Sequence, residues 1–136
     1  MDGCVFCALI GGSIPARRIY EDADHVAFFP LKHIEPGHTL LIPRRHHDYV
    51  FGMPDADYQG LWRTAKRLAP AIKLVSGAAR VGILVEGYSV PHVHVHLVPT
   101  NELNDLNPNR ERSITDADAD RLAADLRTAL SSQEAQ

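Results

Sequence analysis

The stretch of sequence that decides the fold is Pro91-His92-Val93-His94-Val95-His96-Leu97-Val98-Pro99, in which three histidines alternate with hydrophobic residues. Alternation with a period of two, together with the valine-rich composition, predicts a β-strand rather than a helix. Successive side chains of a strand point to opposite faces of a sheet. We therefore expect three imidazoles on one face and the aliphatic side chains in a core on the other.

Strand geometry predicts that the three imidazoles do not share one task. Residues two apart on a strand are separated by about 6.6 Å, so His92 and His96 should lie roughly 13 Å apart along the backbone. A zinc ion binds nitrogen at about 2 Å with tetrahedral angles, which one neighbouring pair can satisfy but all three cannot. We expect one histidine to serve a metal or the scaffold and another to perform chemistry near pH 7.

Length and charge restrict the class of protein. The 136 residues are expected to form a single α+β domain, residues 1–136, without internal repeats. A formal net charge of −3 gives no electrostatic basis for binding a nucleic acid polymer. The chain has no apolar run long enough to span a membrane and no signal-peptide pattern at its start, which predicts a cytoplasmic protein without a membrane partner.

Hydrophobic periodicity predicts a mixture of short strands and helices, with a core over about residues 4–100. Besides the histidine run, strands are expected at 17–21, 25–29, 38–42 and 81–86. Helices are expected at 5–10, from Asp55 to a stop at Gly77, and at 116–131. Asp55 or Asp57 is expected to cap the long helix, and Thr115 the last one. The polar stretch 100–112 is expected to be a loop.

The last expected helix has an apolar stripe formed by Leu122, Leu126 and Leu130. Leucines spaced four residues apart lie on one face of a helix. This face is expected to pack either on the domain itself or on a second copy of the chain.

Both cysteines lie in Cys4-Val5-Phe6-Cys7. The Cys-x-x-Cys spacing lets two thiolates bind one zinc ion, and the eight histidines of the chain offer further ligands. A redox pair is expected at the head of a helix that follows a strand, and nothing precedes this pair to form that strand. Two small buried residues without a special role are the third interpretation.

Four segments are informative together: Cys4-Val5-Phe6-Cys7 with Ile14-Pro15-Ala16, Tyr20-Glu21-Asp22, the run from Pro36-Gly37-His38-Thr39 to His46, and His92-x-His94-x-His96. In order and spacing they resemble the histidine-triad (HIT) superfamily, specifically its Hint-like members with an N-terminal Cys-x-x-Cys. The resemblance covers about residues 4–100. It implies an antiparallel sheet of about five strands with flanking helices, usually paired into a homodimer. It also implies hydrolysis or transfer at the α-phosphate of a purine nucleotide or nucleotide conjugate, with no organic cofactor.

The resemblance also implies roles for particular residues. His94 would attack phosphorus and carry a covalent nucleotidyl intermediate, while its other nitrogen donates to a backbone carbonyl. His96 would donate to a phosphate oxygen or to the leaving group. Ser89 and the turn that ends at Val90 would contact the phosphate. The base would lie in an apolar pocket formed by Val5, Phe6 and Leu9.

In the cysteine-bearing members of the superfamily, the first histidine of the triad joins a structural zinc site. The set implied for this chain has two thiolates and two imidazoles and leaves no open position on the metal. His47 is an alternative to His46 in this set. The implied ligands are Cys4, Cys7, His46 and His92.

The chain departs from the Hint-like pattern where that pattern binds ribose. Pro30 stands in place of an aspartate, Val85 in place of an asparagine, and Tyr88 in place of a glutamine. The triad is intact, but the group that normally holds the ribose hydroxyls is absent. An alternative function is therefore a non-catalytic, zinc-stabilised module that binds nucleotides.

Three further histidines have no catalytic role in this interpretation. His38 matches a family position beside the active-site strand and is expected to be a structural hydrogen-bonding residue. His25 and His33 belong to no pattern, and both are expected at the surface.

Overall fold

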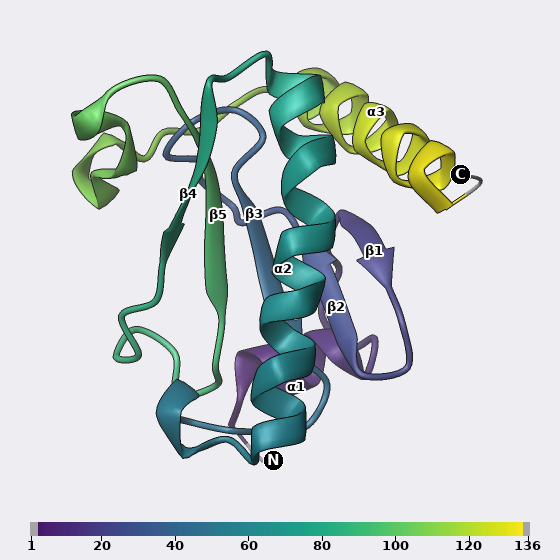
Figure 1. The fold of residues 1–136 in the computed structure, drawn as a ribbon, viewed down its shortest axis with the longest axis vertical. Coiled ribbons are helices and arrows are strands. Elements are labelled where there is room, and N and C mark those ends of the chain that lie inside the picture. Colours follow the sequence, from purple (N-terminus) through teal and green to yellow (C-terminus); the bar gives the residue numbers. More distant parts are fainter. Residues whose placement is uncertain (1–2, 135–136) are drawn as a thin grey trace.

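A computed structural model describes residues 3–134, and within that range five strands form one antiparallel sheet in the order β1-β2-β3-β5-β4 (Figure 1). The strands are β1 (Arg18–Glu21), β2 (His25–Phe28), β3 (Thr39–Pro43), β4 (Arg80–Leu84) and β5 (Val95–Thr100). The helices are α1 (Val5–Ile10), α2 (Asp55–Ser76) and α3 (Asp116–Glu134), with short 3-10 helices η1 (Val50–Gly52), η2 (Leu103–Leu106) and η3 (Pro108–Arg110). The predicted α+β architecture is confirmed.

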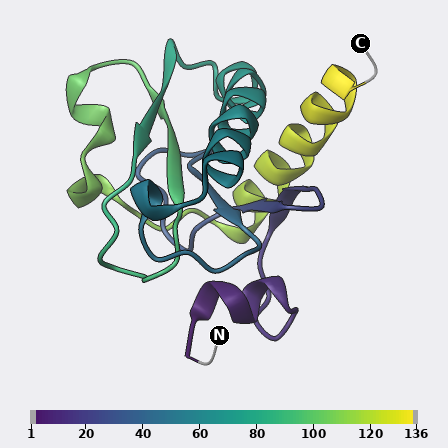
Figure 2. The same ribbon diagram turned by 60° about the horizontal axis from the view of Figure 1, so that its bottom comes forward.

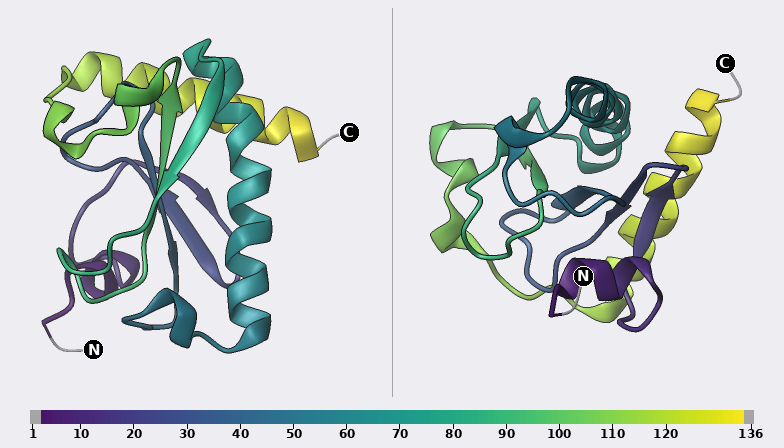
Figure 3. Two further views of the ribbon diagram at one scale, coloured as in Figure 1. Left: turned by 60° about the vertical axis from the view of Figure 1, so that its left-hand side comes forward. Right: turned by 90° about the horizontal axis from the view of Figure 1, so that it is seen from below.

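Each face of the sheet is covered by its own hydrophobic cluster. In β3, Leu41 belongs to the larger cluster with residues of α2 and α3, whereas Leu40 and Ile42 belong to a smaller cluster with residues of α1. Helices α1 and α2 accordingly lie on opposite faces of the sheet (Figure 3). Burial on both faces explains why the central strands β2 and β3 are buried at every position and nearly continuous in hydrophobic residues.

The histidine run spans the start of β5, which begins only at Val95. His96 lies inside the sheet, paired with Leu40 of β3 on one side and Leu84 of β4 on the other. His92 and His94 precede the strand, so the predicted strand begins later than expected. The alternation still holds, since both of those rings contact Phe6 of α1 while the intervening residues Val93, Val95 and Leu97 belong to the cluster under α2.

The helix ends were partly predictable. Gly77 ends α2 in the left-handed conformation, with φ of 73°. The expected aspartate cap of α2 is wrong, because Pro54 occupies the N-cap position and makes no side-chain hydrogen bond there. Asp55 and Asp57 instead lie in the first turn, where a carboxylate favours the positive end of the helix dipole. Thr115 does cap α3, since its Oγ1 accepts from the Asp118 N–H at 3.1 Å.

Helix α3 packs on its own domain. Leu126 and Leu130 are buried, and the helix contacts α2 and β1. Arg17 adds ion pairs to Asp116 at 3.0 Å and Asp120 at 2.8 Å. The leucine stripe is therefore accounted for by the same chain. No helix within residues 3–134 combines the length and the apolarity needed to cross a membrane.

The stretch 100–112 is not the structureless loop that its composition predicted. It forms η2 and η3, which lie at the β4 edge of the sheet, away from α3 (Figure 2). The buried Asp105 carboxylate accepts from the backbone N–H groups of Asn101 and Glu102 and pairs with Arg110, which also pairs with Glu35 at 2.8 Å. Polar side chains order this segment, so hydrophobic periodicity could not reveal it.

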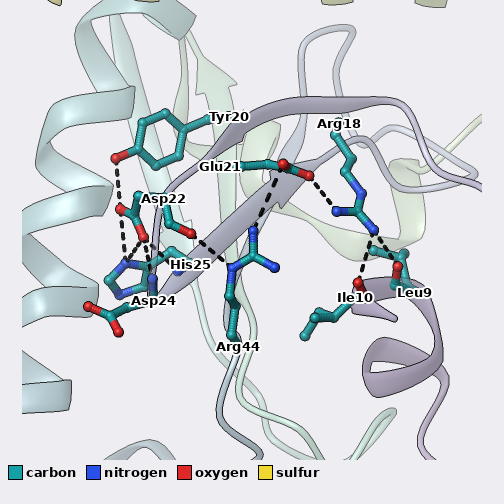
Figure 4. Close-up of polar contacts among 9 residues, drawn as sticks. All are labelled: Leu9, Ile10, Arg18, Tyr20, Glu21, Asp22, Asp24, His25 and Arg44. Carbon is teal, nitrogen blue, oxygen red and sulfur yellow. Dashed lines mark hydrogen bonds and ion pairs between the residues drawn. The ribbon is translucent and has the colours of Figure 1, made fainter. Parts of the chain in front are cut away.

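His25 and His33 are buried, so their expected surface position is wrong. The His25 Nδ1 lies 3.0 Å from the Asp22 carboxylate, which also accepts from the Tyr20 hydroxyl at 2.7 Å (Figure 4). His33 exchanges two backbone hydrogen bonds with Arg112, from 79 positions further along the chain. For His33, a partner as distant as Arg112 leaves no local pattern in the sequence.

Helix α1 is fastened to the β1–β2 hairpin by an arginine. The Arg18 guanidinium donates to the carbonyl oxygens of Leu9 and Ile10 at the end of α1 and pairs with Glu21 (Figure 4). It satisfies carbonyl groups that the last turn of a helix leaves without partners. The hairpin therefore helps to hold α1 against the face that carries the imidazoles.

Candidate functional site

The His94 side chain is fixed in one tautomer. Its Nδ1 lies 2.8 Å from the backbone carbonyl oxygen of His92, and only 3% of the residue is exposed. Because a carbonyl oxygen can only accept, the ring donates through Nδ1–H and keeps a lone pair on Nε2 in its neutral form. A neutral imidazole held in this way presents Nε2 as a nucleophile.

A second chain of hydrogen bonds fixes His96. The Ile34 N–H donates to Nδ1 of His38 at 3.0 Å, so His38 carries its proton on Nε2. That atom lies 2.9 Å from Nδ1 of His96 and donates to it. His96 therefore carries its proton on Nε2 and can donate from that atom. Its ring lies beside that of His94, with the two ring centroids 5.1 Å apart.

Burial keeps these imidazoles uncharged. Burial, followed by the neighbouring imidazoles His96 and His33, lowers the pKa of His38 to about 3. Burial and then the nearby His94 lower the pKa of His96 to about 4. Both rings are therefore neutral at pH 7, as their hydrogen bonds require.

Acid should destabilise this protein. Burial also lowers the pKa of His33, to about 4, so His33, His38 and His96 all titrate below the ordinary value of 6.5. Between about pH 6.5 and 4 the unfolded chain binds more protons, so stability falls with falling pH by about 1.4 kcal/mol per pH unit for each histidine. Urea unfolding from about pH 7.5 to about 4.5 measures this slope.

His33→Phe provides the comparison for that measurement. His33 Nδ1 has no hydrogen-bond partner within residues 3–134, and its ring packs edge-on against Phe29. Phenylalanine keeps a ring in this position and removes the titrating group. The slope of stability against pH should become shallower, and an unchanged slope would contradict the role given to His33.

The turn before the triad brings the expected phosphate donors together. Gly87 has φ of 82°, and the backbone N–H groups of Tyr88 and Ser89 point in the same direction as the Ser89 hydroxyl, toward the carboxylate of Glu86. The nearest Glu86 oxygen lies 3.7 Å from His94 Nε2. Val90, also expected near the phosphate, is partly buried against the smaller cluster. Sequence reasoning did not assign a role to Glu86, although an acidic residue directly before the turn glycine was the available signal.

Of the three residues expected to hold the base, two are buried and one is exposed. Phe6 and Leu9 are buried, and the Phe6 ring lies 5.2 Å from the His94 ring. Val5 is 42% exposed. The wall beside the His94 ring is therefore formed by Phe6, with Leu9 in the cluster behind it.

The four expected metal ligands converge on one point. Their ligand atoms all lie within 4.8 Å of one another, with Cys4 Sγ 3.4 Å from His92 Nδ1 and Cys7 Sγ 3.3 Å from His46 Nδ1. His47 lies outside this group, since its Nε2 is 3.1 Å from the Asp57 carboxylate. The structure thus places His46, and not His47, beside the cysteines.

The donors suit a tetrahedral zinc ion. Sulfur and nitrogen ligands at about 2.3 and 2.0 Å lie roughly 3.5 Å from one another, close to the separations found here. His92 donates through Nε2–H to the Pro43 carbonyl at 2.8 Å, so its Nδ1 lone pair faces the thiols. Burial lowers the pKa of His92, which keeps it in the neutral form that binds metal. Burial and the adjacent Cys4 raise the pKa of the Cys7 thiol, a cost that a bound cation would reverse.

Comparison with known proteins gives a family match. The family model described as HIT domain matches residues 11–103. The chain is 31% identical to an uncharacterized HIT-like protein of Mycobacterium tuberculosis over 138 residues, covering 97% of this chain and 96% of the relative. It is 30% identical to the adenosine 5'-monophosphoramidase of Candida albicans over 111 residues, covering 73% of this chain and 71% of that protein.

A solved structure is similar over almost the whole chain. The Zn-bound histidine triad family protein from Mycobacterium smegmatis superposes with a TM-score of 0.85 and 29% sequence identity, covering 98% of this chain and 96% of that one. The predicted fold is confirmed by this similarity.

Proposed function

This chain belongs to the HIT domain family, and from that premise we propose that it hydrolyses or transfers the nucleotidyl group of nucleoside phosphoramidates or (di)nucleoside phosphates through His94. The observation that carries the proposal is the fixed tautomer of His94, whose Nε2 lies 3.7 Å from the Glu86 carboxylate that the donors of the turn hold. The Candida albicans relative is named an adenosine 5'-monophosphoramidase, which supports a phosphoramidate of a purine nucleoside as substrate.

In the first step, His94 Nε2 attacks the α-phosphorus, and the bond from phosphorus to the leaving nitrogen or oxygen breaks. The leaving atom takes the proton from Nε2 of His96. The hydrogen bond that His38 Nε2–H donates to His96 Nδ1, 2.9 Å long, stabilises the ring that has given up its proton, and the negative charge on His96 is balanced by the positive charge that forms on His94. The positive charge that forms on His94 is stabilised by the carbonyl of His92.

In the second step, water attacks phosphorus in the adduct and the bond between phosphorus and His94 breaks. The proton lost by water returns to His96 Nε2, and the products are a mononucleotide and the protonated leaving group. A different acceptor in place of water would make the same intermediate a transferase intermediate. Covalent catalysis of this kind divides one difficult displacement into two easier ones.

We assign the metal cluster a structural role. Cys4, Cys7, His46 and His92 would hold zinc with no open position, so the ion would tie α1 to the segment before β5 and supply no reacting group. The expected homodimer and the position of the base against Phe6 stay predictions.

Direct detection of the intermediate tests the proposal. The protein is mixed with an adenosine 5'-phosphoramidate or a diadenosine polyphosphate, quenched in base, and examined by mass spectrometry of the peptide that contains His94. We expect an adduct of one adenylyl group on His94 and accumulation of adenosine monophosphate, because the intermediate must form before water reacts. If neither substrate class gives mononucleotide or adduct, the non-catalytic binding module becomes the better function.

A further inference from the structure

The anion-binding turn of this chain is already filled by the chain's own carboxylate. Glu86 accepts from the Tyr88 N–H at 2.8 Å, from the Ser89 N–H at 3.1 Å, and from the Ser89 hydroxyl. These hydrogen bonds, the one from Ser89 first, hold the pKa of Glu86 below its ordinary value. Glu86 is therefore a carboxylate anion at neutral pH.

This carboxylate lies where a reacting phosphate would have to bind. One of its oxygens is 3.7 Å from Nε2 of His94, the atom that would attack phosphorus. Ser89 is the residue expected to contact the phosphate, yet its hydroxyl and N–H are both engaged by Glu86. A phosphate oxygen and the Glu86 carboxylate therefore require the same donors and cannot use them together.

We propose that Glu86 is a specificity-determining residue. Its carboxylate leaves the anion site when a nucleoside phosphoramidate binds, and it disfavours substrates whose leaving group carries further phosphates. The proposal rests on the proposed function, in which the α-phosphate binds beside His94. A substrate phosphate must therefore displace the Glu86 carboxylate from the donors of Tyr88 and Ser89. The negative charge of Glu86 then affects how favourably each substrate binds beside it.

The geometry of the turn explains both parts of this role. The Glu86 side chain is 35% exposed and the adjacent Tyr88 is 93% exposed, so the carboxylate has open solvent to move into. Because Glu86 is part of the same turn, its displaced carboxylate still stays close to the site. It remains within the Debye length of about 8 Å at physiological salt, so its charge still acts on a bound substrate. There it repels a leaving group that carries further phosphates and attracts a leaving amine that is becoming protonated.

Binding of inorganic phosphate tests the competition without any turnover. Glu86→Gln keeps one oxygen that can accept from Ser89, replaces the other with an NH2 donor and removes the charge, and Glu86→Ala removes the group entirely. Both variants should bind phosphate roughly tenfold more tightly than the unaltered protein by calorimetry. Glu111→Gln, a charge change at an exposed residue of the segment after η3, should bind as the unaltered protein does. Unchanged or weaker phosphate binding by both Glu86 variants would overturn the proposal.

Selectivity is tested by kcat/KM for an adenosine 5'-phosphoramidate and for a diadenosine polyphosphate. We expect Glu86→Gln to lower the ratio of the first to the second about tenfold, chiefly by improving the polyphosphate. An unchanged ratio in an active enzyme would overturn the selectivity while leaving the proposed function intact. Absence of turnover in the unaltered protein would count against the proposed function alone, because the phosphate measurement does not depend on it.

Discussion

His94→Ala is expected to lower kcat/KM for an adenosine 5'-phosphoramidate by about 10⁴-fold or more, because it removes the atom that bonds to phosphorus. His96, His38 and the donors of the turn keep their own hydrogen bonds in this variant, so the substrate can still bind. The loss should therefore appear in kcat, with KM changed little. Steady-state kinetics by chromatography of released mononucleotide measures both.

Two controls separate this effect from a loss of structure. His47→Gln removes a histidine that bonds to Asp57 outside the triad, and it should keep normal turnover. Binding of adenosine monophosphate by His94→Ala should also survive, because the anion donors remain in place. Equal release of mononucleotide by His94→Ala and the unaltered protein would exclude the covalent mechanism.

The shared face of the triad and the grouping of the two cysteines with His92 were predictable because their signals are local. The period of two in the histidine run fixes which side chains share a face, and the Cys-x-x-Cys spacing marks a pair of thiols that one turn of helix brings together. The resemblance then supplied His46 as a partner, and the position of its Nδ1 3.3 Å from Cys7 Sγ agrees with that assignment.

Features that depend on distant or purely polar contacts were not predictable. The backbone of the buried His33 pairs with that of Arg112, and the hydrogen bond between His38 and His96 joins residues 58 positions apart. Glu86 was overlooked for a different reason. An acidic side chain next to a glycine is common in exposed turns, and only the folded turn brings its carboxylate to within 3.7 Å of His94 Nε2.

Removal of zinc is expected to lower the stability of the fold and the activity together. The protein purified without chelator should contain about one zinc per chain, and a strong chelator should reduce the free energy of unfolding by at least about 3 kcal/mol. For a chain of this length that corresponds to a fall in Tm of roughly 10 °C. Metal analysis and thermal unfolding measure these effects, and a protein without zinc after such purification would contradict the assignment.

The reason for a joint loss is the position of the cluster between α1 and the catalytic segment. Cys4 caps α1 and Cys7 lies within it, while His92 is two residues from His94 and provides the carbonyl that fixes its tautomer. Cys7→Ser should therefore lose zinc, melt at lower temperature and lose turnover, whereas His47→Gln should keep all three because His47 is not among the ligands. If Cys7→Ser lost its zinc but kept full stability and turnover, the ion would not be what holds Phe6 and His92 around the nucleophile.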